Sequence, residues 1–195
     1  ISKQFRKNGK SCQPDDRGTT KGINRMDGEK TKLFVFYLGG SAPGANIEVH
    51  DVQFAAVRKP EDAYPIMAEK WYGTRKGLHI DAYGIVDWAD GHDVTLSPEK
   101  PAGSSRLFFV NMGGYLPGRL REDHQFAFFV AENEEDAKRK ARNTLLVDYE
   151  HQHKDNLMEV DDCVLIDALE GQYVHLNPNP SGQPVRAIFQ GVIWG

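Results

Sequence analysis

The order of apolar and polar residues predicts the same set of strands and helix twice along the chain. Residues 33–38 are apolar at every position, which is typical of a central strand covered on both faces. Residues 50–57 alternate instead and place Val52, Phe54 and Ala56 on one face of a second strand. Both patterns return from Leu107 onwards, so we expect a repeated unit.

A helix is predicted after each pair of strands. Acidic residues open both helices, at Pro60-Glu61-Asp62 and at residues 133–136, because the positive helix start favours carboxylates. We expect Pro65 to bend or delay the first helix, and Gly73 to end it in a left-handed conformation. The second helix is expected to be longer, since six extra residues follow it around 147–154. The predicted buried positions recur at i, i+4 and i+8: Ala63, Met67 and Trp71, then Ala137, Ala141 and Leu145.

Identical residues in the two copies show how closely the units correspond. Between Leu33 and Ala63, 12 of 31 aligned pairs are identical at an offset of 74 residues, without a gap. A second block aligns at an offset of 80 and pairs Asp81 with Asp161 and Asp87 with Asp167. The identical pairs include GG, PG and E-x-H motifs: Gly39-Gly40, Pro43-Gly44, Glu48 and His50 in the first copy, and Gly113-Gly114, Pro117-Gly118, Glu122 and His124 in the second.

These patterns predict an α+β fold of two tandem ββαββ repeats that form antiparallel-rich sheets, with helices packed on one face and a pseudo-twofold between units. The last two strands of each unit are expected to join at Asp90-Gly91 and Glu170-Gly171. We expect a disordered basic tail at residues 1–31, repeat units at 32–98 and 106–178, and a C-terminal loop and extra strand at 179–195. That extra strand, at residues 185–194, is expected to pair with an exposed sheet edge.

The motif set resembles the bacterial family known as domain of unknown function 1543. The resemblance rests on an apolar strand followed by GG, PG, an E-x-H pair, an acidic helix start and a D-G hairpin, and it covers about residues 32–180. It implies a tandem-unit protein of bacterial origin. It implies no catalytic residues, because the family has no known activity.

Charge and composition limit the classes of partner. Residues 1–25 hold seven Lys or Arg against two Asp, while the rest of the chain holds 17 Lys or Arg against 26 acids. An acidic body repels phosphate backbones, so nucleic-acid binding is not expected there. No apolar run is long enough to span a membrane, and we expect no membrane partner and a cytoplasmic location. Two cysteines are too few for a disulfide framework, and Cys163 is interpreted as a small buried residue.

The GG-x-x-PG segment is the first candidate site. Glycines allow positive φ, and successive N–H groups can then converge on an anion. The alternative is a wide hairpin loop that needs glycine only for its shape. The candidate glycines are Gly39 and Gly40 in the first copy and Gly113 and Gly114 in the second. Because Arg119 and Arg121 follow the second loop, any anion site is expected in the second copy.

The E-x-H pairs are the second candidate site. On an extended strand, Glu48 and His50 share the face of Val52, and so do Glu122 and His124 in the second copy. Such a pair can be structural, can bind a ligand or metal, or can act in acid–base catalysis. If the two pairs meet, Glu48, His50, Glu122 and His124 would form a metal site.

Other histidines are weaker candidates. Glu150-His151-Gln152-His153 is interpreted as a solvated helix end, and His79, His92 and His175 as surface or hydrogen-bonded residues. No cofactor is expected beyond a possible divalent metal. The predicted function is a non-enzymatic module that binds an unknown small ligand, an anion or a protein. The alternative is a metal-dependent hydrolase that uses the paired E-x-H motifs.

Overall fold

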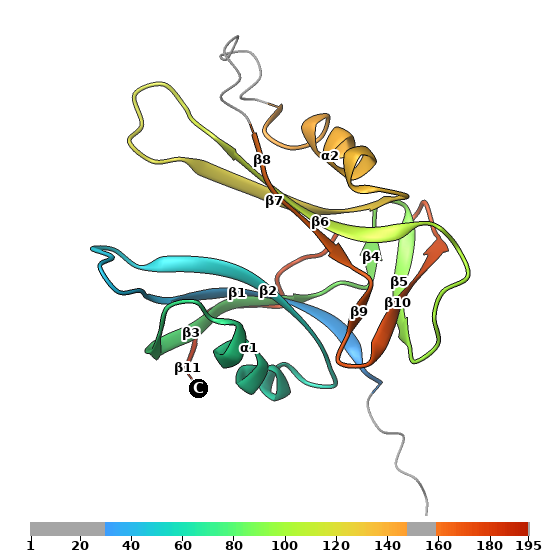
Figure 1. Ribbon diagram of the computed structural model, residues 1–195, viewed down its shortest axis with the longest axis horizontal. Helices are drawn as coiled ribbons and strands as arrows, with labels where there is room; N and C mark the ends of the chain where they lie inside the picture. Colours follow the sequence, from blue (N-terminus) through green and yellow to red (C-terminus); the bar gives the residue numbers. More distant parts are fainter. Residues whose placement is uncertain (1–29, 148–158, 195) are drawn as a thin grey trace, which may run out of the picture.

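The computed structural model describes residues 30–147 and 159–194. The expectations for the basic tail and for the histidines of residues 150–153 therefore lie outside the described residues. Mostly antiparallel strands and two short helices make up the structure (Figure 1). None of the helices in the described residues is long and apolar enough to cross a membrane.

The first sheet has the strand order β11-β3-β1-β2. It contains β1 (Lys32–Ser41), β2 (Val49–Val57), β3 (Thr74–Ile85) and β11 (Phe189–Trp194). The apolar run at residues 33–38 lies in β1, which has a strand on each side in this sheet, so its predicted central place is confirmed. The C-terminal strand β11 pairs with the outer edge of β3 and begins four residues later than the predicted 185.

The second sheet, in the order β7-β6-β8, repeats the β2-β1-β3 part of the first and has no counterpart of β11 among the described residues. Its strands are β6 (Arg106–Gly114), β7 (Asp123–Ala131) and β8 (Glu159–Ile166). The apolar strand β6 again lies in the middle. Figure 1 shows that the β1–β2 and β6–β7 hairpins project toward the same side of the molecule.

A third sheet joins the two units. It has the order β4-β5-β10-β9, with β4 (Trp88–Ala89) and β5 (His92–Ser97) from the first unit and β9 (Ala168–Leu169) and β10 (Gln172–Pro178) from the second. The predicted Asp90-Gly91 and Glu170-Gly171 turns join β4 to β5 and β9 to β10, so β3 and β8 end before these hairpins. Asp90 and Gly91 have φ values of 45° and 80°, and Glu170 and Gly171 have 47° and 75°, as type I′ turns require.

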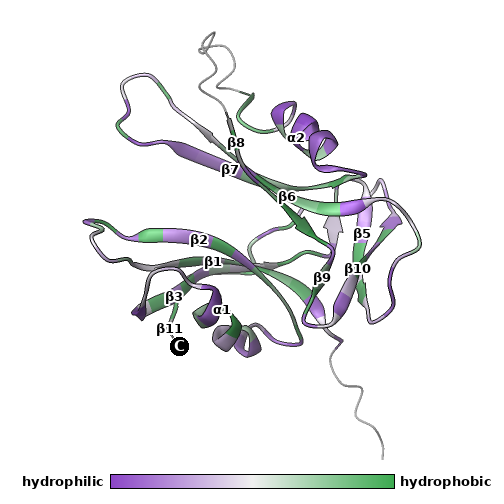
Figure 2. Ribbon diagram, in the orientation of Figure 1, coloured by the Kyte–Doolittle hydropathy of each residue, from purple (hydrophilic) through white to green (hydrophobic). Residues whose placement is uncertain are grey.

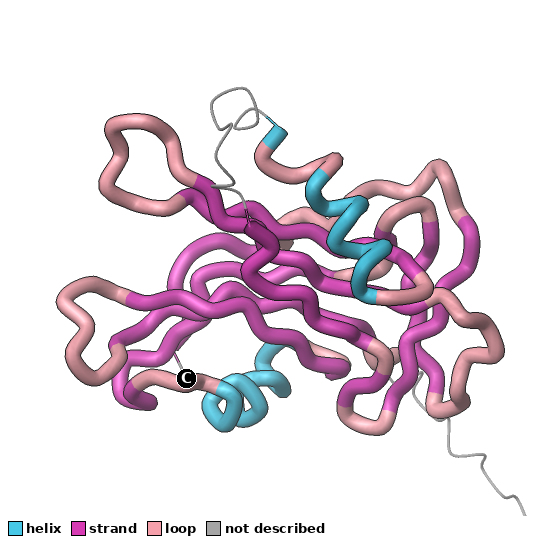
Figure 3. Tube along the Cα trace, turned by 45° about the horizontal axis from the view of Figure 1, so that its top comes forward, coloured by secondary structure: helices cyan, strands magenta, loops and turns pink. Residues whose placement is uncertain are grey.

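The helices lie on the outer sides of the two large sheets, as Figures 1 and 3 show. Pro60–Ala63 forms a 3-10 turn before α1 (Tyr64–Lys70), so Pro65 falls in the first turn of a delayed helix, as expected. Helix α2 (Glu134–Arg142) is capped by Asn133, whose side chain accepts a hydrogen bond from the Asp136 N–H.

One expectation for the helix ends was wrong, and the other was only partly right. Helix α1 ends at an extended Trp71, and Gly73 does not have positive φ. Glycine is needed there for space, since a Cβ atom would lie 2.4 Å from the Ser41 carbonyl oxygen. Helix α2, with 9 residues, is longer than α1, with 7, as expected. It nevertheless stops at Arg142 and does not continue to Leu145, although Leu145 is buried as predicted.

Three hydrophobic clusters hold these layers together. One lies between the first sheet and α1 around Phe36 and Met67, and one lies between the second sheet and α2 around Val110 and Ala141. The third is shared by the two units and contains Leu33, Phe54, Val86, Ala89, Val94, Leu107, Phe109, Val130, Ile166 and Val174. Figure 2 shows hydrophobic stretches along the central strands β1 and β6 and a largely hydrophilic α2.

Carboxylates at the two type I′ turns make reciprocal contacts between the units. The Val130 N–H of β7 donates to Asp90 Oδ2 over 3.0 Å, and the Ala56 N–H of β2 donates to Glu170 Oε2 over 2.6 Å. These four residues are two pairs of equivalents in the repeat. Each carboxylate therefore satisfies a backbone donor on an edge strand of the opposite unit.

Candidate functional site

Three neighbouring strands of the first unit bring two histidines over one glycine. Gly39 of β1 pairs with His50 of β2 on one side and with His79 of β3 on the other. Glycine is required at the centre, since a Cβ atom would lie 2.6 Å from both His79 Nε2 and Asp81 Oδ2. The two imidazoles and the carboxylate can approach one another only across a residue without a side chain.

Glu48, His50, His79 and Asp81 form an alternating ring of carboxylates and imidazoles, which we call the His–acid cluster. His79 Nε2 lies 3.1 Å from Glu48 Oε1 and 3.2 Å from Asp81 Oδ1. His50 Nε2 lies 3.3 Å from Asp81 Oδ2 and 3.6 Å from Glu48 Oε2. His79 is buried, with 5% of the residue exposed, while the Glu48 side chain is 48% exposed. The cluster therefore has a fixed inner histidine and an open acidic rim.

The hydrogen bonds of His79 fix its orientation. Its Nδ1 lies 2.8 Å from the Gly77 carbonyl oxygen, which can only accept, so Nδ1 carries the hydrogen. Nε2 is thereby directed at the two carboxylates. Glu48 and Asp81 are thus the two acidic groups that face Nε2.

A β-bulge places Asp81 in the cluster. Tyr37 pairs with Ala82 and Leu38 with Ile80, so Asp81 is the extra residue of β3. The second unit repeats this irregularity: Asn111 pairs with Asp162 and Met112 with Val160, which leaves Asp161 as the extra residue of β8. Both copies thus carry an aspartate at the same bulge.

The predicted anion-binding role of the paired glycines is not matched by their conformation. Gly39 and Gly40 lie inside β1 and Gly113 and Gly114 inside β6, and none of the four has positive φ. Positive φ occurs instead at Gly44 and Gly118, with values of 82° and 79°, in the turns that follow Pro43 and Pro117. The interpretation of GG as part of the loop was therefore wrong, because β1 and β6 continue through both glycines.

The two arginines of the second loop contact an acidic neighbour. Arg119 Nη1 and Arg121 Nη2 each lie 3.1 Å from one oxygen of Asp123. Valine occupies the equivalent position in the first unit, at Val49. Asp123 thus offsets part of the positive charge on which the predicted anion site depends.

The second E-x-H pair has different neighbours from the first. His124 Nε2 lies 3.6 Å from Glu122 Oε2, and its Nδ1 lies 3.4 Å from Asn111 Nδ2. The position equivalent to His79 is Glu159, which pairs with Gly113. The second unit therefore keeps the Glu–His pair but has no histidine opposite it.

A cleft between the units contains residues of both E-x-H motifs. Its volume is about 860 Å³, and Glu48, His50, Asn111 and His124 line it. Three of the four residues predicted as a metal set, Glu48, His50 and His124, thus line one cleft, and Glu122 is not among its lining residues. However, in residues 30–147 and 159–194, no three His, Cys, Asp or Glu side chains are positioned to hold one metal ion.

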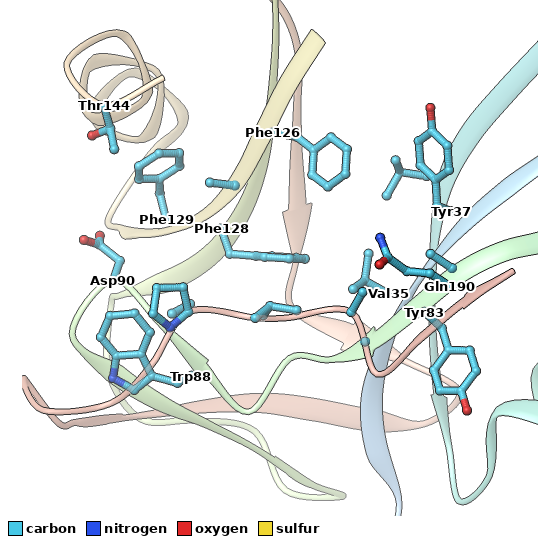
Figure 4. Close-up of a pocket in the computed structure, with 18 residues that line it drawn as sticks. Val35, Tyr37, Tyr83, Trp88, Asp90, Phe126, Phe128, Phe129, Thr144 and Gln190 are labelled. Carbon is cyan, nitrogen blue, oxygen red and sulfur yellow. The ribbon is translucent and has the colours of Figure 1, made fainter. Parts of the chain in front are cut away.

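A more apolar pocket of about 590 Å³ adjoins this cleft and shares Tyr37, Val52 and Phe126 with it. Figure 4 shows Tyr37 on one side of the pocket and Phe126 and Phe128 opposite, with Trp88 and Asp90 farther along. The pocket and the cleft are thus neighbours that share three lining residues, and the pocket is the more apolar while acids and histidines line the cleft.

Tyr37 lines both the apolar pocket and the cleft. Its ring stacks on His50 at a centroid distance of 5.1 Å and faces Phe126 of the other unit at 6.4 Å. Burial, and secondly the charge of Asp81, raise the pKa of the Tyr37 hydroxyl, so the phenol stays neutral at neutral pH. Tyr37 and Phe126 are 37% and 40% exposed, so their rings are accessible.

The free thiol of Cys163 has no features of a reactive site. It packs against the cluster beneath α2. Burial, followed by the charge of Glu134, raises the pKa of this thiol. The neutral thiol is therefore the dominant form near neutral pH, as expected for a structural cysteine.

A protein-family model, the Domain of Unknown Function DUF1543, matches the chain in two tandem regions, at residues 45–96 and 119–169. These regions together span more than half of the sequence and contain both E-x-H pairs. The chain belongs to this family. The suspected two-copy membership is confirmed, and the repeats seen in the sequence are two DUF1543 domains.

A solved structure is similar to this chain over most of its length. The crystal structure of a protein Il1583 from Idiomarina loihiensis is similar at 34% sequence identity and a TM-score of 0.65, covering 84% of this chain and 97% of that one. No curated protein matches the chain. These comparisons identify the family and assign no activity.

Sequence reasoning missed two members of the His–acid cluster. His79 was interpreted as a surface or hydrogen-bonded histidine and not as part of a site, although its hydrogen bond to Gly77 is as expected, and the repeated Asp81 was counted only as a matched position. Two signals were present: His79-x-Asp81 has the spacing of Glu48-x-His50, and Asp81 is identical to Asp161. The sheet order, which places β3 next to β1, could not be read from these spacings.

Proposed function

We propose that this DUF1543 protein is a ligand-binding module that holds a small molecule in the cleft between its two units. The observation that carries the proposal is the adjoining pocket and cleft, each of which is lined by residues of both domains. Ligand sites are characteristically concave and largely apolar, with a few convergent polar groups. Here the apolar pocket supplies the first feature, and the His–acid cluster supplies the second.

The duplication supports this proposal. We infer that each unit follows the ββαββ plan with its helix on the outer face, and that a pseudo-twofold turns the inner faces toward each other. The reciprocal contacts of Asp90 and Glu170 agree with such an arrangement. The inner faces meet fully around Leu33 and Leu107 and diverge toward the β1–β2 and β6–β7 hairpins, where the cleft opens.

The alternative function, a metal-dependent hydrolase using Glu48, His50, Glu122 and His124, gains no support from the side-chain positions. His50 and His124 line the cleft, but their acidic neighbours contact them separately within each unit. A ligand site requires only that the groups face a common space. The binding function is therefore the better account of the geometry.

The proposal is tested by filling the apolar pocket. Ala82 lines it beside Tyr37, and Ala82→Phe would occupy part of its volume. The neutral fluorescent probe N-phenyl-1-naphthylamine should brighten on binding to the unaltered protein, and its affinity should fall about tenfold or more in the variant, as loss of a well-packed aromatic contact predicts. Circular dichroism would confirm that the variant remains folded.

Ala102→Phe is the matched control, because Ala102 is exposed in the linker between the units. Binding of the probe should be unchanged by this substitution. If the probe fails to bind the unaltered protein, or binds both variants equally well, the cleft is not a ligand site for apolar molecules.

A further inference from the structure

We propose that the ligand of the cleft is an organic cation, an ammonium group attached to an apolar or aromatic body. This inference rests on the proposed function and specifies its ligand class. The ammonium group would contact the carboxylates of Glu48 and Asp81, and the body would extend past Tyr37 and Phe126 into the apolar pocket.

The charges of the residues that line the cleft favour a cationic ligand. Glu48, Asp51 and Asp162 line the cleft, and Lys70 is its one lysine or arginine among the described lining residues. The Lys70 ammonium donates to the Phe54 carbonyl oxygen over 2.7 Å, so it is held at the backbone of β2. Asp81 adds a further carboxylate within the cluster. An acidic cleft attracts positively charged molecules and repels anions.

The geometry of the His–acid cluster fits the same ligand. The side chains of Glu48 and Asp81 are 48% and 24% exposed, so both carboxylates are accessible to solvent, and Glu48 also lines the cleft. An ammonium group has three donors and can bond to both carboxylates in a charge-assisted manner. The buried His79 contacts both carboxylates and thereby helps to fix their positions.

The aromatic side chains favour an organic cation over an inorganic one. The exposed rings of Tyr37 and Phe126 border the cluster, and aromatic faces attract cations through their quadrupole. The adjoining apolar pocket can bury a hydrocarbon body, as Figure 4 shows for the aromatic residues around it. A metal ion is less well matched, since no three described His, Cys, Asp or Glu side chains are positioned to hold one.

The experiment compares three probes of similar shape and different charge at neutral pH: 2-phenylethylamine, 2-phenylethanol and 3-phenylpropanoate. Isothermal titration with the full chain should give the order amine, alcohol, carboxylate, from tightest to weakest. Glu48→Gln and Asp81→Asn should each weaken amine binding about tenfold while leaving the alcohol unchanged, because only the charge-assisted contact is removed. Asp62→Asn, at an exposed acid of the 3-10 turn, is the control and should change neither.

Several outcomes would overturn the inference. Equal binding of all three probes, or amine binding that is insensitive to Glu48→Gln and Asp81→Asn, would show that charge does not select the ligand. If N-phenyl-1-naphthylamine binds but the amine does not, the cleft remains a ligand site and only the cation assignment fails. If Zn²⁺ alone raises the melting temperature and the amine does not, the cluster holds an inorganic ion. If neither probe class binds, both proposals fail.

Discussion

Gly39 sets the distance between the imidazoles on the strands beside it. Its lack of a side chain lets His79 and Asp81 approach across β1, and the bulge at Asp81 turns that carboxylate toward the histidines. The role of neither residue can be recognised from the sequence alone. A glycine in an apolar strand and an aspartate two residues after a histidine are both common. Their significance depends on the order of strands in the sheet.

Gly39→Ala should destabilise the protein through this cluster. The added Cβ would lie 2.6 Å from two side-chain atoms and force them apart, at a cost of roughly 1–3 kcal/mol in the free energy of unfolding. Chemical denaturation of the variant measures this loss. Gly103→Ala is the control, since a Cβ there meets no atom within 4 Å. Equal stability of the two variants would mean that the cluster is loosely packed.

At the scale of elements, the sequence predicted what depends on local pattern. The central strands β1 and β6 and the buried faces of both helices follow from hydrophobic periodicity, and the Asp90-Gly91 turn follows from its residue types. The joining sheet could not be predicted, because the pairing of β5 with β10 is a contact between units that leaves no local signal. The ends of α1 and α2 were wrong for a similar reason, since tertiary contacts determine where they stop.

The Asp90 turn should contribute measurably to the contact between units. Asp90 accepts from the Val130 N–H and lies 2.6 Å from the Lys140 ammonium, which also donates to the Val130 carbonyl oxygen. Asp90→Gly removes the carboxylate but keeps a residue that tolerates positive φ. We expect a loss of about 1–3 kcal/mol in the free energy of unfolding, because a backbone donor loses its partner.

A double-mutant cycle separates the charge contact from the rest of that loss. Lys140→Met removes the ammonium, and the combined variant should be more stable than the sum of the two single losses predicts. Strict additivity would show that Asp90 and Lys140 do not interact in solution.

At the scale of the molecule, the two DUF1543 units depend on each other. Their shared cluster contains Leu33 and Val94 from the first unit and Leu107 and Val174 from the second, and the joining sheet takes strands from both. A unit on its own would expose this apolar surface. Burial of a common core is the physical reason to expect one cooperative structure.

Thermal unfolding should therefore show one transition, with equal calorimetric and van't Hoff enthalpies. Leu107→Ala, in the shared cluster, should lower the stability of the whole chain by roughly 2–5 kcal/mol and shift that single transition without splitting it. Two transitions, of which only one moves in the variant, would show that the units unfold independently.

The central claim is that both units contribute to one ligand site. A titration of the isotope-labelled protein with 2-phenylethylamine, followed by backbone amide NMR signals, tests it most directly. The predicted result is a shared saturation curve for residues of both units, including Tyr37, His50, Phe126 and His124. Shifts confined to one unit, or located away from the cleft, would contradict the claim.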